Sequence, residues 1–359
     1  MIALLLFSKI DLAQTMSALP YIITPSTIAG VIDKSYSNIQ HLNQQIAQLK
    51  SVIERSFDHY GAVLMRGFSV DNEEQFASII RIFDFDLLNY DFGSTPRSVI
   101  KKGVYTSTEY PSHQVIPQHC EQAYCLQWPK KLWFYSRLVA ENNGETPIAD
   151  CQKIYDSIPA QIKNIFEKKG LLYVRNYGNG LDLPWQQAFG TDNQEEVSAY
   201  CDKNNIGFQW KDDDELRTWQ KCQVSIQHPK NHRWTWFNQA HLFHISNLSD
   251  SVKETLLSVV DKEDLPRNVY FGDGSEIPDQ ILDEIRAVIE EHTVSFPWQE
   301  SDVMLIDNLR VSHGRNVFSG NRKVFVAMTE PFGAVNLEAS SVMPKLNELQ
   351  PGQFPSSLF

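Results

Sequence analysis

The chain has 359 residues, of which 42% are hydrophobic and 21% are charged, as in a globular protein with a sizeable core. Its 32 basic and 44 acidic residues give a net charge of −12, which argues against general binding to nucleic acid or an anionic membrane, because phosphate contacts need clustered cations. No run reaches the roughly 20 apolar residues that span a bilayer. The 5 cysteines are an odd number without a Cys-x-x-Cys pair, which favours a reducing compartment over a disulfide framework. We therefore expect a cytoplasmic protein that binds neither nucleic acid nor membrane.

The first 20 residues are interpreted as an N-terminal extension. The apolar run at residues 1–7 is short, follows no basic cluster and precedes no clear cleavage site, so it does not resemble a signal peptide. Met16 offers an alternative start. No repeat or low-complexity linker divides the remainder, and we expect residues 21–359 to form a single domain with an insertion at about 171–250.

Five stretches carry apolar residues at helical spacing. Gly61 is placed to end the first of these helices, and Asp71 to cap the second. The predicted helices cover residues 37–60, 72–83, 153–169, 251–260 and 278–292.

Buried strands are predicted where apolar, aromatic and β-branched residues run together. The polar stretch at 93–112 is either a wall of the site described next or an ordinary surface loop. Residues 171–246 are interpreted as an insertion between two halves of a β core, forming a lid or a substrate wall. The predicted strands cover residues 62–68, 132–140, 171–177, 302–312 and 323–330, the last two joined by a turn at 319–321.

His119 and Glu121 stand two residues apart in apolar and aromatic surroundings. On an extended strand, residues i and i+2 face the same way, so the imidazole and the carboxylate would meet at one point while Cys120 packs behind the strand. Two histidines and one carboxylate with open positions suit a non-haem Fe(II) centre. The pair alone is weak evidence, since His-x-Glu arises by chance in many chains.

A second cluster supplies another histidine. The strand predicted at 302–312 runs into a polar end that delivers His313, and Arg322 begins the returning strand. Arg322 shares a face with Val324, Val326 and Met328, which places a guanidinium at the mouth of an apolar interior. Its planar fork is suited to holding a carboxylate there, although a surface arginine in a turn is the alternative.

Several segments, in order between about residues 60 and 332, resemble the TauD/TfdA-type Fe(II)/2-oxoglutarate dioxygenases of the clavaminate-synthase-like group. No single segment identifies the family, but the segments taken together are specific for it. Two departures, Asn143 and Ser301 where the family carries glycine, touch no proposed ligand. The matching segments are His119-x-Glu121, Asn-Gly-Glu-Thr-Pro at 143–147, residues 270–278, residues 307–315 and residues 318–322.

This resemblance implies a mainly β fold with flanking helices around a double-stranded β-helix (jelly-roll) core. It implies that His119, Glu121 and His313 bind Fe(II). It also implies that Thr146 and Arg322 hold the distal carboxylate of 2-oxoglutarate, with O2 as the oxidant.

The expected reaction is hydroxylation of a small molecule, with release of succinate and CO2. The resemblance favours an amino acid, free or tethered to a carrier protein, or a natural-product intermediate. Glu121 favours oxidation over halogenation, because related halogenases lack this carboxylate so that chloride can bind the metal. Arg315 is expected to support the ligands without touching the metal. The candidates for substrate contact are Thr106, Tyr110, Asn238 and His241.

Two alternatives stay open. The same iron site could catalyse desaturation or cyclisation, which residues near the metal do not distinguish. A protein of another class, a non-catalytic jelly-roll metal- or ligand-binding protein, could keep the three ligands as a redox-silent zinc site. His241 and His244 also stand at helical spacing and could bind a metal, but the resemblance favours a place in the pocket wall or core.

Overall fold

The structure is a computed structural model that describes residues 20–24, 39–83, 86–88, 98–101, 103–107, 110–178, 180–334 and 342–343. Within these ranges helix and strand are present in similar amounts, where we expected a mainly β chain. The chain is therefore a mixed α/β protein with several antiparallel sheets. Apart from residue 20, the predicted N-terminal extension lies outside the described ranges.

The largest sheet runs in the order β1-β2-β16-β6-β19-β4-β3. Its long central pair is β6 and β19, which are antiparallel with Phe134 opposite Val326. The strands are β1 (Tyr21–Ile23), β2 (Ala62–Met65), β16 (Val303–Asp307), β6 (Gln127–Leu138), β19 (Lys323–Gly333), β4 (Val104–Thr106) and β3 (Val99–Lys101).

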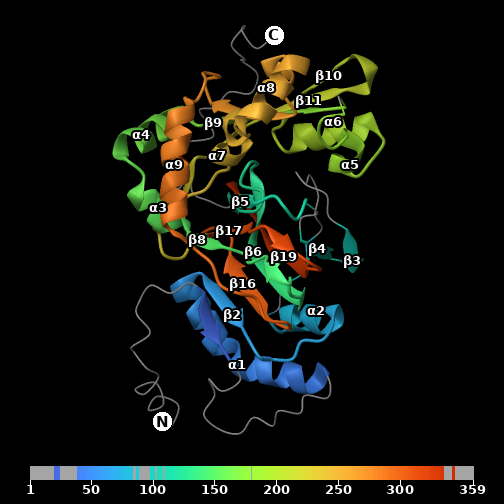
Figure 1. The fold of residues 1–359 in the computed structure, drawn as a ribbon, viewed down its shortest axis with the longest axis vertical. Helices are drawn as coiled ribbons and strands as arrows, with labels where there is room; N and C mark the ends of the chain where they lie inside the picture. Colours follow the sequence, from blue (N-terminus) through green and yellow to red (C-terminus); the bar gives the residue numbers. More distant parts are fainter. Residues whose placement is uncertain are drawn as a thin grey trace.

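Both faces of this large sheet are buried. On β6, Trp133 and Tyr135 join the apolar cluster formed with two helices, whereas Leu132 and Phe134 join a cluster on the other face. The two helices are α1 (Ile39–Tyr60) and α2 (Glu73–Ile82), which lie below the sheet in Figure 1. Strands covered on both faces read as continuous apolar runs, which is why the sequence pattern located β2, β6, β16 and β19.

A smaller sheet, in the order β15-β8-β17-β5, covers the second face. Ile148 and Val311 from this sheet share one apolar cluster with Met304 and Val326 from the large sheet. Its edge strand β5 pairs with β17, and both strands carry histidines of interest. The strands are β15 (Thr293–Val294), β8 (Ile148–Asp150), β17 (Val311–Arg315) and β5 (Ile116–His119).

A third sheet, in the order β10-β11-β9-β14, draws most of its strands from the region predicted to be an insertion. Figure 1 shows it at the end of the molecule opposite α1 and α2. Its strands and the neighbouring helices are β9 (Leu171–Tyr177), β10 (Gly207–Trp210), β11 (Leu216–Cys222), β14 (Arg267–Phe271), α5 (Trp185–Phe189), α6 (Gln194–Lys203) and the short η3 (Asp212–Asp214).

Further helices and short strands surround these sheets, and α3, α4 and α9 gather on one side in Figure 1. The helices are α3 (Cys151–Ser157), α4 (Ala160–Lys169), α7 (Ala240–Phe243), η4 (Ile245–Asn247), α8 (Asp250–Val259), η5 (Lys262–Asp264) and α9 (Asp279–Glu291). The strands are β7 (Asn142–Asn143), β12 (Ser225–Gln227), β13 (Trp234–Trp236), β18 (Phe318–Ser319) and β20 (Val342–Met343).

Two details of the predicted helices were wrong. The helix expected at 153–169 is divided into α3 and α4, because Ile158 is extended (φ −62°, ψ 132°) before Pro159. A residue that precedes proline is pushed out of the helical region by the proline ring. The cap of α2 is Asn72, not Asp71, since the Asn72 side chain accepts the Gln75 N–H at 3.0 Å.

The strand predicted at 302–312 is also two strands. The Asp307 carboxylate accepts the Leu309 N–H at 3.0 Å, a turn that ends β16 before β17 begins in a different sheet. Residues 302–312 and 323–330 were expected to be two strands joined by a turn at 319–321, but these strands do not pair with each other, because β19 pairs with β6 and β4. This turn carries β17, and with it His313, into the smaller sheet.

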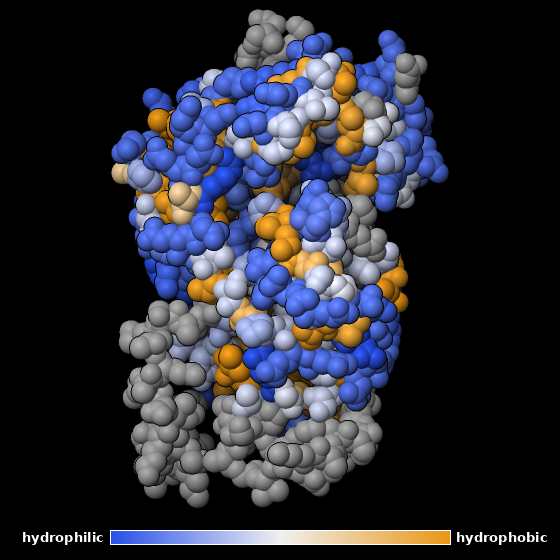
Figure 2. Space-filling model, viewed as in Figure 1, coloured by the Kyte–Doolittle hydropathy of each residue, from blue (hydrophilic) through white to orange (hydrophobic). Residues whose placement is uncertain are grey.

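The surface agrees with the charged composition. Figure 2 shows a face dominated by hydrophilic side chains, with apolar side chains in scattered patches. Among the described residues, no helix combines the length and apolar character that a membrane crossing requires.

Candidate active site

The two predicted histidine ligands are brought together by the pairing of β5 with β17. His119 and His313 are direct partners in this antiparallel ladder, and their ring centroids lie 4.3 Å apart. The register shifts immediately after this pair, at a bulge between His313 and Arg315. Bulges re-aim side chains next to active sites, so this irregularity fits the placement of the two imidazoles.

Glu121 reaches the same place by a different route from the one expected. β5 ends at His119, and Glu121 stands in the following turn, where Gln122 has a φ of 58°. The explanation by strand alternation was therefore wrong, although the two residues do converge. Cys120 is buried as expected, with its thiol 3.7 Å from the thiol of Cys151.

The three side chains form a compact donor set. One ligand atom from each of His119, Glu121 and His313 lies within 4.8 Å of the other two. His119 Nδ1 lies 2.9 Å from the carbonyl oxygen of Pro117, so Nδ1–H donates there and Nε2 keeps its lone pair for a metal. Two imidazole nitrogens and one carboxylate oxygen fit the requirements of non-haem Fe(II).

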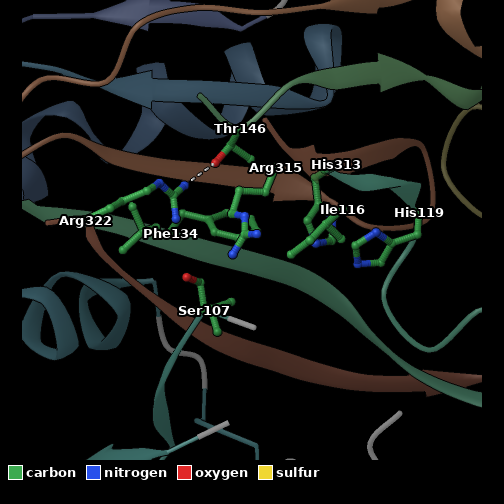
Figure 3. A pocket seen from close by; sticks show the side chains of 11 residues that line it. Ser107, Ile116, His119, Phe134, Thr146, His313, Arg315 and Arg322 are labelled. Carbon is green, nitrogen blue, oxygen red and sulfur yellow. Dashed lines mark hydrogen bonds between the residues drawn. The ribbon is translucent and has the colours of Figure 1, made fainter. Parts of the chain in front are cut away.

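A pocket adjoins the donor set. In Figure 3, His119 and His313 stand at one end, Arg322 and Thr146 stand at the other, and Arg315 lies between them. The apolar wall includes Val324 and Val326, as the alternation on the returning strand predicted. The lining residues are Ser107, Ile116, His119, Phe134, Thr146, His313, Gly314, Arg315, Arg322, Val324 and Val326.

The end opposite the histidines is organised around the Thr146 hydroxyl. Its oxygen accepts hydrogen bonds from Trp298 Nε1 at 3.0 Å and from Arg322 Nη2 at 3.3 Å, while Arg322 Nε donates to the Gly144 carbonyl at 2.8 Å. Burial, and then the charge of Arg315, lower the pKa of Arg322 to about 10, with Glu145 acting against this. Arg322 therefore remains a cation at neutral pH.

Arg315 holds the loop that precedes β5. Its Nη1 donates to the Tyr110 carbonyl at 2.8 Å, and its Nη2 donates to the carbonyls of Pro111 at 2.6 Å and Gln114 at 2.9 Å. Burial lowers the pKa of this guanidinium from its ordinary value. The side chain thus lines the pocket and ties down the loop, a position that sequence reasoning described only as support for the ligands.

None of the four substrate candidates is among the pocket-lining residues. Thr106 ends β4 next to the lining residue Ser107, and Tyr110 is 44% exposed. Asn238 is buried and donates to the Val224 carbonyl at 2.8 Å. His241 is buried and donates from Nε2 to the Gln118 carbonyl at 2.8 Å. Their contact with substrate stays a prediction.

Sequence reasoning missed Trp298 and passed over Asn308 as part of a longer motif. Trp298 Nε1 reaches Thr146 across 152 positions in the chain, and Asn308 contacts Glu121 across 187. No local pattern signals either contact, although a buried tryptophan usually finds a partner for its N–H. His244 bonds to the Ser246 hydroxyl at 2.9 Å, and it does not join the His119 cluster, the metal-ligand group found among the described residues.

The family match and the sequence relatives agree with this geometry. Residues 24–328 match the family model described as "Taurine catabolism dioxygenase TauD, TfdA family". The dapdiamide synthesis protein DdaC of Enterobacter agglomerans is 40% identical over 318 residues, which cover 88% of this chain and 93% of the relative. A clavaminate synthase-like protein of Arabidopsis thaliana is 31% identical over 297 residues, which cover 79% and 86%. Among solved structures, a taurine dioxygenase from Burkholderia xenovorans has a TM-score of 0.44 and 13% identity over 88% of this chain and 90% of that one.

Proposed function

This chain belongs to the TauD/TfdA family of Fe(II)- and 2-oxoglutarate-dependent dioxygenases, and on that premise we propose that it hydroxylates a small molecule at an iron held by His119, Glu121 and His313. One observation carries the assignment. The three ligand atoms come from two segments that are far apart in the sequence, yet they lie within 4.8 Å of one another beside a pocket whose other end is cationic.

Bound at these three side chains, Fe(II) with 2-oxoglutarate and O2 would supply the oxidant that attacks a C–H bond, with release of succinate and CO2. The protein's own part is to hold the metal with two neutral imidazoles and one carboxylate, which leaves positions open. Membership of this family disfavours the alternative of a non-catalytic zinc-binding protein.

The cationic end of the pocket suits the distal carboxylate of 2-oxoglutarate. The Thr146 oxygen already accepts two hydrogen bonds, so its own O–H proton is left to donate to a ligand. Arg322 and Arg315 donate to neutral carbonyl and hydroxyl oxygens, which do not neutralise their charges. A dianionic cosubstrate would add negative charge beside these two cations.

The core that positions this pocket is proposed to be a double-stranded β-helix. The support is the apolar cluster shared by the large sheet and the smaller sheet, together with the placement of His119 and His313 on neighbouring strands. Residues 21–359 are proposed to form one domain, with residues 171–250 inserted as a substrate wall.

The proposed substrate is an amino acid, free or tethered to a carrier protein, or a natural-product intermediate. The 40% identical relative carries the name of a dapdiamide synthesis protein, which supports a biosynthetic substrate. Thr106, Tyr110, Asn238 and His241 remain the proposed substrate neighbours. Desaturation or cyclisation at the same iron is the second candidate, and mass spectrometry separates the two, since hydroxylation adds one oxygen whereas either alternative removes two hydrogens.

The test is anaerobic addition of Fe(II) and then 2-oxoglutarate to the metal-free protein. We expect a weak visible charge-transfer band in the wild type and its loss in His313→Ala. If Fe(II) binds but no band develops, 2-oxoglutarate does not chelate this iron and the proposal fails. If His313→Ala keeps the band, the metal is bound elsewhere.

A further inference from the structure

Glu121 is a proposed metal ligand that no strand holds in place. It follows the end of β5 and stands in a turn that continues through Gln122 at positive φ. Its two histidine partners, by contrast, are paired directly in a β-ladder. The direction of the Glu121 carboxylate therefore depends on contacts outside the ladder.

The Asn308 side chain bonds to both backbone groups of Glu121, the N–H and the carbonyl. The Glu121 N–H donates to Asn308 Oδ1 at 2.6 Å, and Asn308 Nδ2 donates back to the Glu121 carbonyl at 3.0 Å. The same Nδ2 donates to the Pro129 carbonyl at 2.8 Å. The side-chain amide of Asn308 thus does for Glu121 what a neighbouring strand would do, because it offers one donor and one acceptor to the Glu121 backbone.

Asn308 is itself firmly placed. It is fully buried at 0% exposure, and its own backbone N–H donates to the Lys130 carbonyl at 3.0 Å. It stands in the turn between β16 and β17, and β17 carries His313. This one turn therefore links the carboxylate ligand to the strand of the second imidazole.

Two further side chains bond to carbonyl groups of residues 118–122, the end of β5 and the turn after it, which we call the ligand turn. Gln239 Nε2 donates to the Cys120 carbonyl at 2.7 Å, and His241 Nε2 donates to the Gln118 carbonyl at 2.8 Å. Both come from the region predicted to be an insertion, whereas Asn308 comes from the turn between β16 and β17. The ligand turn is thus held by side chains from two separate parts of the chain.

We propose that Asn308 is a positioning residue that sets metal affinity. It fixes the backbone of Glu121, and so the direction of the Glu121 carboxylate. The inference rests on the proposed function, since it takes Glu121 as a metal ligand. Hydrogen-bonding partners behind first ligands typically change metal affinity roughly 10- to 100-fold when removed.

The experiment is titration of metal-free protein with Co(II), whose visible bands report both affinity and coordination, alongside thermal unfolding. The variants are Asn308→Ala and Asn308→Asp, the second of which keeps the size and one acceptor oxygen but removes the donor nitrogen. We expect each to raise the Kd for Co(II) roughly 10- to 100-fold and to alter the bands.

Asn176→Ala is the matched control. Asn176 is also buried, donates from Nδ2 to the carbonyls of Glu263 at 3.0 Å and Leu265 at 2.7 Å, and accepts from Arg217 Nε at 2.9 Å. It lies on β9, outside the pocket lining and the ligand turn. Its loss should lower the melting temperature and leave the Kd unchanged.

Wild-type affinity in a folded Asn308 variant overturns the inference, and so does an equal loss of affinity in Asn176→Ala, which would report general destabilisation. If the wild type binds no Co(II), or if His313→Ala binds it as tightly, the proposed function fails and the inference fails with it. Should Asn308→Ala not fold, Asn308→Asp decides the question by the same criteria.

Discussion

Arg322 and the histidine ligands stand at opposite ends of one pocket, so each end can be altered separately (Figure 3). Arg322→Ala removes the cation proposed to bind the distal carboxylate of 2-oxoglutarate. A hydrogen bond to a charged group is worth about 1.5–3 kcal/mol, so the Kd for 2-oxoglutarate should rise roughly 10- to 150-fold. Titration of the charge-transfer band of the Fe(II) protein measures this change.

The Kd for the metal should stay within about twofold of the wild type in Arg322→Ala, because this side chain is not among the proposed ligands. Arg137→Ala is the control, since Arg137 is 3.2 Å from Glu300 in an exposed ion pair. Unchanged binding of 2-oxoglutarate by Arg322→Ala would show that the cosubstrate lies elsewhere in the pocket.

Trp298→Phe tests whether the indole orients Thr146. The change keeps an aromatic ring but removes the N–H that donates to Thr146 Oγ1 at 3.0 Å. Loss of one neutral hydrogen bond costs about 0.5–1.5 kcal/mol, so the Kd for 2-oxoglutarate should rise roughly 2- to 10-fold. Isothermal titration of the metal-loaded protein without O2 gives the value.

Trp236→Phe is the comparison for that variant. Trp236 is buried, and within the described residues its indole N–H has no hydrogen-bond partner, so the change removes ring area alone. If both variants weaken 2-oxoglutarate binding equally, the effect of Trp298→Phe comes from packing and not from the hydrogen bond.

The sequence could predict the residues that belong to short motifs typical of metal ligands. His119, Glu121 and His313 were chosen because their types and spacing suit a metal, and the structure does bring them together. Trp298 and Asn308 could not be chosen that way, because each acts on a residue more than a hundred positions away. Such contacts are set by the packing of sheets and turns, which a local pattern does not record.

The pairing of β5 with β17 depends on a glycine. A Cβ atom at Gly314 would lie 2.6 Å from the Ile116 carbonyl oxygen, so Gly314→Ala must push the two strands apart. Because His119 and His313 are partners across this ladder, their imidazoles should separate too. We expect a loss of about 1–3 kcal/mol in unfolding free energy and a clear fall in metal affinity. Denaturant unfolding and Co(II) titration measure the two effects.

Gly333→Ala provides a matched strand variant away from the metal. A Cβ there would meet the carbonyl oxygen of Leu126, the residue just before β6, at the same 2.6 Å, where the end of β19 pairs with the start of β6. It should lower stability by a similar amount and leave the metal affinity unchanged. A fall of affinity in both variants would mean that affinity follows overall stability and not the spacing of β5 and β17.

At the level of elements, the errors of the sequence analysis have physical causes. The predicted helix at 153–169 ignored the extended conformation that Pro159 imposes on Ile158. The long strand at 302–312 hid a turn because Leu309 and Val311 are apolar, whereas the Asp307 side chain closes that turn. Apolar runs therefore located buried segments well, but the polar contacts that divide these segments needed the structure.

At the level of the whole molecule, the arrangement of sheets follows from covering each apolar face. The helices α1 and α2 cover one face of the large sheet and the smaller sheet covers the other. The layer that holds the ligands is thus built from residues near 120 and near 313. Local periodicity in the sequence does not predict which of such distant segments pair with each other.

This long-range construction makes a prediction for the stability of the folded chain. A metal bound by His119, Glu121 and His313 joins segments that are far apart in the unfolded chain, so it should bind the folded state alone. At a concentration 100 times its Kd, Mn(II) should stabilise the fold by about 2.7 kcal/mol. For a chain of this size we expect the melting temperature to rise by roughly 4 °C. Scanning calorimetry with and without Mn(II) measures the shift, and His313→Ala should show none. A full shift in that variant would place the stabilising metal at other residues, because the loss of one of three ligands cannot leave the affinity of this site unchanged.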